Sequence, residues 1–169
     1  QGTLLSGSGL EASLRKRVLR SIANGLFVLT TRQEDTFGAA SISWLSQASF
    51  EPPLLMVALR RETSVWQGLS AGEYAVIHVV ERGQEDIAKR FFTGCEVRDG
   101  LINGQPFDEG PEGQPLLREL PHRIHVRKRS MHPSGGDHDL FLMEVHHLET
   151  GSAVPSPLNV AESPWEYGG

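Results

Sequence analysis

The side chains best suited to binding a ligand gather between positions 41 and 49, where hydroxyl groups and one amide follow a run of small residues. Small residues let a planar ligand approach the backbone, and serine hydroxyls with Gln47 can pair with its polar edge. A serine-rich passage from a strand into a loop explains the same composition, and composition alone favours it. The candidate residues are Ser41, Ile42, Ser43, Trp44, Ser46, Gln47 and Ser49.

A second candidate site lies at residues 60–64, just before an expected short helix over residues 64–70. Arg60, Arg61, Thr63 and Ser64 stand there, where free backbone N–H groups and the helix dipole suit a phosphate. An ordinary helix cap explains Thr63 and Ser64 equally well. The sequence leaves both interpretations open.

Metal and thiol chemistry are weakly supported. Six of the seven histidines fall between residues 122 and 147, but His122 and His125 are three apart and would face opposite sides of a strand. Cys95 is the one cysteine and stands beside Glu96, whose charge disfavours a thiolate. We predict pairing or surface roles for the histidines, no metal site and no catalytic cysteine. Gly7-Ser8-Gly9 lacks the further residues of a nucleotide-binding loop.

Composition limits the class of protein. The 169 residues are 38% hydrophobic and 22% charged, which is typical of one globular domain, here expected over residues 10–169 after a flexible segment 1–9. Sixteen basic against 21 acidic residues give a net charge of −5, which disfavours nucleic acid and anionic membranes. The longest apolar run, residues 54–59, is too short to span a bilayer. A single cysteine is consistent with the cytoplasm.

The elements that must position these residues are mostly strands. Apolar residues at every fourth position from Leu10 predict an amphipathic helix that ends at Asn24-Gly25. Expected strands cover residues 26–31, 37–44, 54–59, 74–80, 122–131 and 139–148. Further helices are expected at 64–70 and 84–92, and residues 93–121 are expected to be irregular. This pattern favours a closed or partly closed β-barrel with helical decoration.

Five segments in this order resemble the flavin reductase-like family of FMN-binding split barrels, over about residues 22–148. The segments are residues 25–31, 41–54, 74–80, 84–91 and 136–145. The sequences of residues 46–50 and 164–169 are similar to the corresponding segments of flavoredoxins and of flavodiiron-associated reductase domains. The resemblance implies a mainly β fold, a split barrel of Greek-key type with a few short helices.

The resemblance also implies roles for individual residues. The flavin ring would lie against residues 41–44, with Ser46, Gln47 and Ser49 following. The phosphate region would comprise Arg61, Thr63 and Ser64, supported by Lys89 or Arg90. The Gly-Asp-His motif would place His138 where it orients the hydride donor and the flavin, with Asp137 positioning its imidazole. The sequence departs from the family at Ser41, Ser43, Trp44 and His78.

The activity implied is hydride transfer from NAD(P)H to FMN, with FAD as a possible flavin. Electrons would then pass to an acceptor protein or, as free flavin, to a flavin-dependent monooxygenase, and the chain would form a homodimer. The alternative is a flavin- or haem-binding module of the same superfamily without NAD(P)H turnover. Chemistry like that of pyridoxamine-phosphate oxidase ranks last, because no more basic substrate pocket is evident.

Overall fold

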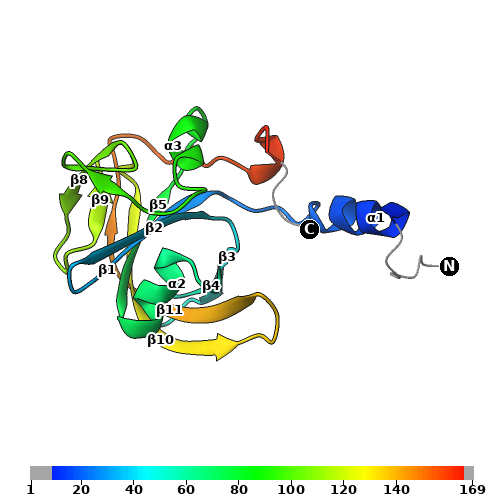
Figure 1. The fold of residues 1–169 in the computed structure, drawn as a ribbon, viewed down its shortest axis with the longest axis horizontal. Helices are drawn as coiled ribbons and strands as arrows, with labels where there is room; N and C mark the ends of the chain where they lie inside the picture. Colours follow the sequence, from blue (N-terminus) through cyan, green and yellow to red (C-terminus); the bar gives the residue numbers. More distant parts are fainter. Residues whose placement is uncertain (1–8, 166–169) are drawn as a thin grey trace.

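A computed structural model describes residues 9–165, and its main feature is a curved antiparallel sheet (Figure 1). Its seven strands follow the spatial order β2-β1-β5-β10-β11-β4-β3. They are β1 (Phe27–Gln33), β2 (Thr36–Ile42), β3 (Leu45–Ser49), β4 (Leu54–Arg60), β5 (Tyr74–Val79), β10 (Arg123–Pro133) and β11 (His138–Glu149). Within the described residues the edge strands β2 and β3 do not pair with each other, so the barrel is split. The predicted fold class is confirmed.

Helix α2 (Ser64–Ala71) packs against β1, β2 and β4, inside the curve of the sheet (Figure 1). Two glycines allow this close approach. A Cβ on Gly68 would lie 2.3 Å from Thr31 Oγ1, and a Cβ on Gly38 would lie 2.8 Å from the carbonyl oxygen of Ser64. The start of α2 is therefore held tightly against the outer edge of β2.

The face of β1 and β5 away from α2 carries a second apolar cluster, covered by the short helix α3 (Glu85–Lys89) and a small sheet. The small sheet has the order β6-β7-β8-β9, and its strands are β6 (Val97–Arg98), β7 (Leu101–Ile102), β8 (Gln105–Glu109) and β9 (Pro115–Leu117). The prediction that residues 93–121 are irregular is wrong. Asp99-Gly100 and Asn103-Gly104 adopt positive φ and close two-residue hairpins between these very short strands.

Buried His78 joins the small sheet to the large one. Its Nδ1–H donates to the carbonyl oxygen of Val28 over 2.9 Å, and its Nε2 accepts from the Leu117 amide over 3.0 Å. The side chain is completely buried. Both ring nitrogens are therefore used to connect β5, β1 and β9.

Helix α1 (Gly9–Leu19) confirms the predicted element but not its end or its packing. It projects away from the sheet (Figure 1), and Leu10, Val18 and Ile22 are exposed. Asn24-Gly25 does not cap it, because Gly25 instead forms a β-bridge with Asn159. Apart from Gly9, the segment 1–9 lies outside the described residues, as do residues 166–169.

Helix α3 is shorter than the predicted 84–92, and β3 was not expected as a strand. No helix in the described part of the chain has the length and apolarity needed to span a bilayer.

Candidate functional site

A cavity of about 530 Å³ opens where β2, β4 and the start of α2 meet. Its walls are residues 39–44, 58–60, 62–65 and 91–94, together with His138. This volume falls in the usual range for small-molecule sites, about 300–1,000 Å³. Ala39, Ala40 and Ala58 keep part of the wall small and apolar.

Seven of the thirteen predicted site residues line this cavity, although they come from three distant parts of the chain. They are Ser41, Ile42, Ser43, Trp44, Thr63, Ser64 and His138. The remaining six lie outside its lining: Ser46, Gln47, Ser49, Arg61, Lys89 and Arg90.

The chain leaves the cavity after Trp44 because it enters β3. This strand pairs antiparallel with β4, and the Ala58 amide donates to the carbonyl oxygen of Trp44 over 3.0 Å. Ser46 and Gln47 are exposed on this edge strand, and the Ser46 hydroxyl donates to the Gln47 carbonyl oxygen. Only the first half of the serine-rich stretch therefore faces the cavity.

Lys89 and Arg90, at the end of α3, are exposed, and the Arg90 guanidinium faces Gly104 in the small sheet. The backbone of this segment supports the cavity instead. The Ser41 hydroxyl donates to the Ala88 carbonyl oxygen over 2.7 Å, and the Ser41 amide donates to that of Phe91 over 3.0 Å. These bonds bring residues 91–94 to the cavity, a contact that local sequence patterns do not reveal.

The hydroxyls of Thr63 and Ser64 fix the start of α2. Thr63 Oγ1 caps the helix by accepting from the Trp66 amide over 3.3 Å, so the capping interpretation is confirmed for this residue. Ser64 Oγ accepts from the Ala39 amide over 3.1 Å and donates to the Ala39 carbonyl oxygen. The first-turn amides of Ser64 and Val65 have no acceptor among residues 9–165, and both residues line the cavity. This helix end can bind an anion.

Ser43 provides a polar group that needs a partner. The residue is 2% exposed, and its hydroxyl makes no hydrogen bond within the described chain. Leaving a buried hydroxyl unpaired costs about 1–3 kcal/mol. A ligand with a polar edge beside Ser43 fits this part of the wall.

His138 stands at the cavity between an aromatic ring and a carboxylate. Its ring centroid is 4.6 Å from that of Trp44, with 46° between the planes, and its Nδ1–H donates to Asp137 Oδ1 over 2.6 Å. The hydrogen bond from His138 lowers the pKa of Asp137. The predicted pairing of Asp137 with His138 is therefore present, and Trp44 packs against the same imidazole.

The buried histidines His122 and His125 have structural partners. His122 contacts Glu81 and Thr150, and His125 Nε2 donates to Glu149 Oε2 over 2.6 Å. Across residues 9–165, no group of three or more His, Cys, Asp or Glu side chains is arranged to hold a metal ion.

The fold and the cavity define a flavin reductase-type split barrel, and residues 19–164 match the family described as "Flavin reductase like domain". The chain belongs to this family. It is 32% identical over 115 residues to Diflavin flavoprotein A 1 of Synechocystis sp., covering 65% of this chain and 19% of that protein. It is 26% identical to HsaB, the reductase subunit of a flavin-dependent monooxygenase of Mycobacterium tuberculosis, covering 88% of this chain and 80% of HsaB.

The chain thus spans about a fifth of the length of the diflavin flavoproteins that it matches. Among solved structures, the Streptomyces globisporus NADH:FAD oxidoreductase SgcE6, in complex with NAD and FAD fragments, superposes with a TM-score of 0.73. The match covers 94% of this chain and 90% of SgcE6 at 22% identity, so it supports the fold.

Proposed function

We propose that the chain is an NAD(P)H:flavin oxidoreductase that binds FMN in the cavity between β2, β4 and α2. One observation carries this proposal. A single cavity combines a serine-bearing strand end, a helix N-terminus with unpaired amides, and a histidine held against a tryptophan. FMN has matching parts, a flat polar-edged ring and a phosphate.

The residues present fit this cofactor. The amides of Ser64 and Val65 would bind the phosphate. Arg60 and Glu62 both line the cavity, so their opposite charges offset each other and the helix amides are the proposed phosphate contacts. The backbone of residues 41–44 and the Ser43 hydroxyl would pair with the polar edge of the ring. Arg61 is not part of this set, because its guanidinium binds Asp139 and the Gly136 carbonyl oxygen.

Bound FMN would supply the redox chemistry, and NAD(P)H would supply the hydride. The protein then needs to orient two rings and needs no strong acid or base. His138 is suited to orienting because Asp137 fixes one ring nitrogen and Trp44 packs against the imidazole at a tilt.

We further propose that the electrons pass to a partner, either a flavin-dependent monooxygenase served by released flavin or an acceptor protein. HsaB is named as the reductase subunit of a flavin-dependent monooxygenase. A homodimer is supported by the exposed apolar residues Leu10, Val18 and Ile22 of the N-terminal region. The half-buried free thiol of Cys95 is consistent with a reducing cytoplasm.

Filling the cavity tests the assignment. Ala58→Leu adds three carbon atoms to its wall, whereas Ala48→Leu adds them on the exposed surface of β3. We expect the Kd for FMN, measured by quenching of flavin fluorescence, to rise more than about tenfold in Ala58→Leu, because overpacking at the site opposes the ligand. Ala48→Leu should keep the wild-type Kd.

Turnover is then measured as FMN-dependent oxidation of NADH and of NADPH by the wild-type protein under air. Oxidation of either nucleotide supports the reductase. Tight FMN binding without oxidation of either would instead identify a flavin-binding module. Absence of FMN binding, or equal loss in both leucine variants, would overturn the proposed site.

A further inference from the structure

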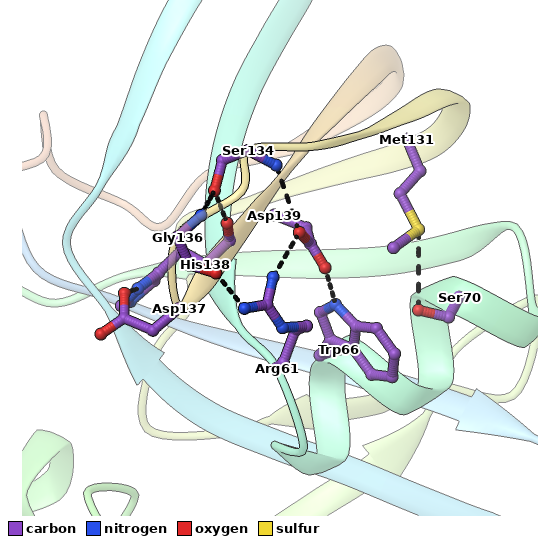
Figure 2. Close-up of polar contacts among 9 residues, drawn as sticks. All are labelled: Arg61, Trp66, Ser70, Met131, Ser134, Gly136, Asp137, His138 and Asp139. Atoms are coloured by element: carbon purple, nitrogen blue, oxygen red, sulfur yellow. Dashed lines mark hydrogen bonds and ion pairs between the residues drawn. The ribbon is translucent and has the colours of Figure 1, made fainter.

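The tight turn that precedes His138 is held by a polar network outside the cavity lining, centred on one buried carboxylate. Residues 134–137 connect β10 to β11, and His138 is the first residue of β11. Asp139, the next residue, is 2% exposed and faces three donors. They are Arg61 Nη1 at 3.0 Å, Trp66 Nε1 at 2.9 Å and the Ser134 amide at 3.4 Å (Figure 2).

Arg61 binds the same turn at two further points. Its backbone amide donates to the Asp137 carbonyl oxygen over 3.1 Å, and its Nη2 donates to the Gly136 carbonyl oxygen. Within the turn, the Ser134 hydroxyl donates to the His138 carbonyl oxygen and accepts from the Gly136 amide (Figure 2). The backbone on both sides of the imidazole is therefore fixed.

The other end of this network is the segment that begins α2. Arg61 immediately precedes the cavity residues Glu62, Thr63 and Ser64, and Trp66 lies in the first turn of the helix. Asp139 thus ties the turn carrying His138 to the helix end proposed to bind phosphate. The start of α2 is also held by the Thr63 and Ser64 hydroxyls, so loss of the Asp139 contacts affects chiefly the turn.

We propose that Asp139 is a positioning residue for hydride transfer, which holds His138 in place through Arg61, Trp66 and the turn at residues 134–137. The inference rests on the proposed function. It also gives Arg61 a role different from the phosphate contact expected from sequence, because both of its Nη atoms are engaged away from the cavity.

The network depends on the carboxylate being ionised. Burial raises the pKa of Asp139, but the donors Trp66, Ser134 and Arg61 outweigh burial and hold it below its usual value. Asn at this position keeps the size but turns an NH₂ group toward one of these donors. Asp139→Asn therefore breaks at least one contact and leaves the Arg61 charge without its partner.

The experiment measures the rate of FMN reduction by NADH under single-turnover, anaerobic conditions, together with the Kd for FMN. Asp139→Asn should lower the limiting rate between about tenfold and about hundredfold, because a displacement near 1 Å can cost that much. The Kd for FMN should change less than about threefold, because cavity contacts remain. Trp66→Phe, which keeps an aromatic ring at this partly buried position but removes the Nε1 donor, should also lower the rate.

Ser70→Ala is the matched control. Ser70 also lies on α2 and contacts β10 through Met131 Sδ at 3.8 Å, but it does not touch the turn (Figure 2). Its rate should equal that of the wild type. If Asp139→Asn fails to fold, Trp66→Phe carries the same comparison.

A double-mutant cycle with His138→Ala separates positioning from general stability. If Asp139 acts through His138, Asp139→Asn should change the rate less than about twofold in the His138→Ala background. Additive losses, an equal fall in rate and FMN affinity, or a wild-type rate in His138→Ala would overturn the inference. Failure of both NADH and NADPH to reduce FMN bound to the wild-type protein would overturn the proposed function instead.

Discussion

Acidification is expected to destabilise this protein through one buried imidazole, that of His78. Burial lowers its pKa from 6.5 to about 3, with smaller contributions from the charges of Arg123 and His125, against the opposing hydrogen bond to Val28. The folded state therefore keeps His78 neutral below pH 6.5, whereas the unfolded state takes up a proton. The contribution of His78 to the free energy of unfolding is fully present above pH 6.5. It is lost progressively as the pH decreases from 6.5 toward 3.

The magnitude follows from the two pKa values. Each unit of difference corresponds to about 1.4 kcal/mol, so the loss from His78 is about 2 kcal/mol at pH 5 and approaches about 5 kcal/mol near pH 3. His78→Asn abolishes this contribution, because an amide does not titrate. It also removes the acceptor of the Leu117 amide, so the variant should be less stable at pH 7 by about 1–3 kcal/mol.

The assay is urea unfolding followed by tryptophan fluorescence at pH 7 and at pH 5, without added flavin. The free energy of unfolding of the wild type should fall between these pH values by about 2 kcal/mol more than that of His78→Asn. His132→Asn, the same change at an exposed histidine, keeps His78 and should retain the loss that it causes. Equal pH dependence in the wild type and His78→Asn would refute the argument.

Three further predictions concern single positions. Ser64→Asp should raise the Kd for FMN about tenfold beyond Ser64→Ala in a fluorescence titration, because a carboxylate near a phosphate costs about 1–2 kcal/mol even in water; equal Kd values would reject the phosphate assignment. Gly68→Ala should lower the free energy of unfolding by about 1–3 kcal/mol, because its Cβ would lie 2.8 Å from Thr31 Cβ, whereas Gly94→Ala meets no atom within 4 Å; similar stability of both variants would contradict this. The Cys95 thiol, whose pKa burial raises, should react with iodoacetamide at pH 8 more slowly than free cysteine does, as mass spectrometry would show; an equal rate would contradict it.

Local patterns in the sequence predict most of the large sheet, because its strands are apolar runs bounded by turn residues. Local patterns fail where contacts between distant parts of the chain determine the secondary structure. The Asn24-Gly25 pair has the composition of a helix cap, but Gly25 pairs with Asn159, far along the chain. Residues 97–117 form strands of two to five residues, which are too short to show the alternation of apolar and polar residues typical of a strand. Asp99-Gly100 and Asn103-Gly104 are nevertheless recognisable hairpin signals.

Some residues of the candidate site can be predicted from local sequence patterns, whereas others depend on tertiary contacts. Ser41, Thr63 and His138 lie in segments that the sequence singles out, and the structure brings them to one cavity. Arg61 is a residue type expected at a phosphate site. Its guanidinium instead binds Asp139, a buried carboxylate 78 positions further along the chain. The wall at residues 91–94 depends on long-range bonds to β2 and leaves no local signal.

A crystal structure of the protein with FMN bound would test the proposed flavin site most directly. The ring should lie beside residues 41–44, near Trp44 and His138, and the phosphate should lie on the amides of Ser64 and Val65. FMN bound at another surface, or bound here with its phosphate away from the start of α2, would contradict it.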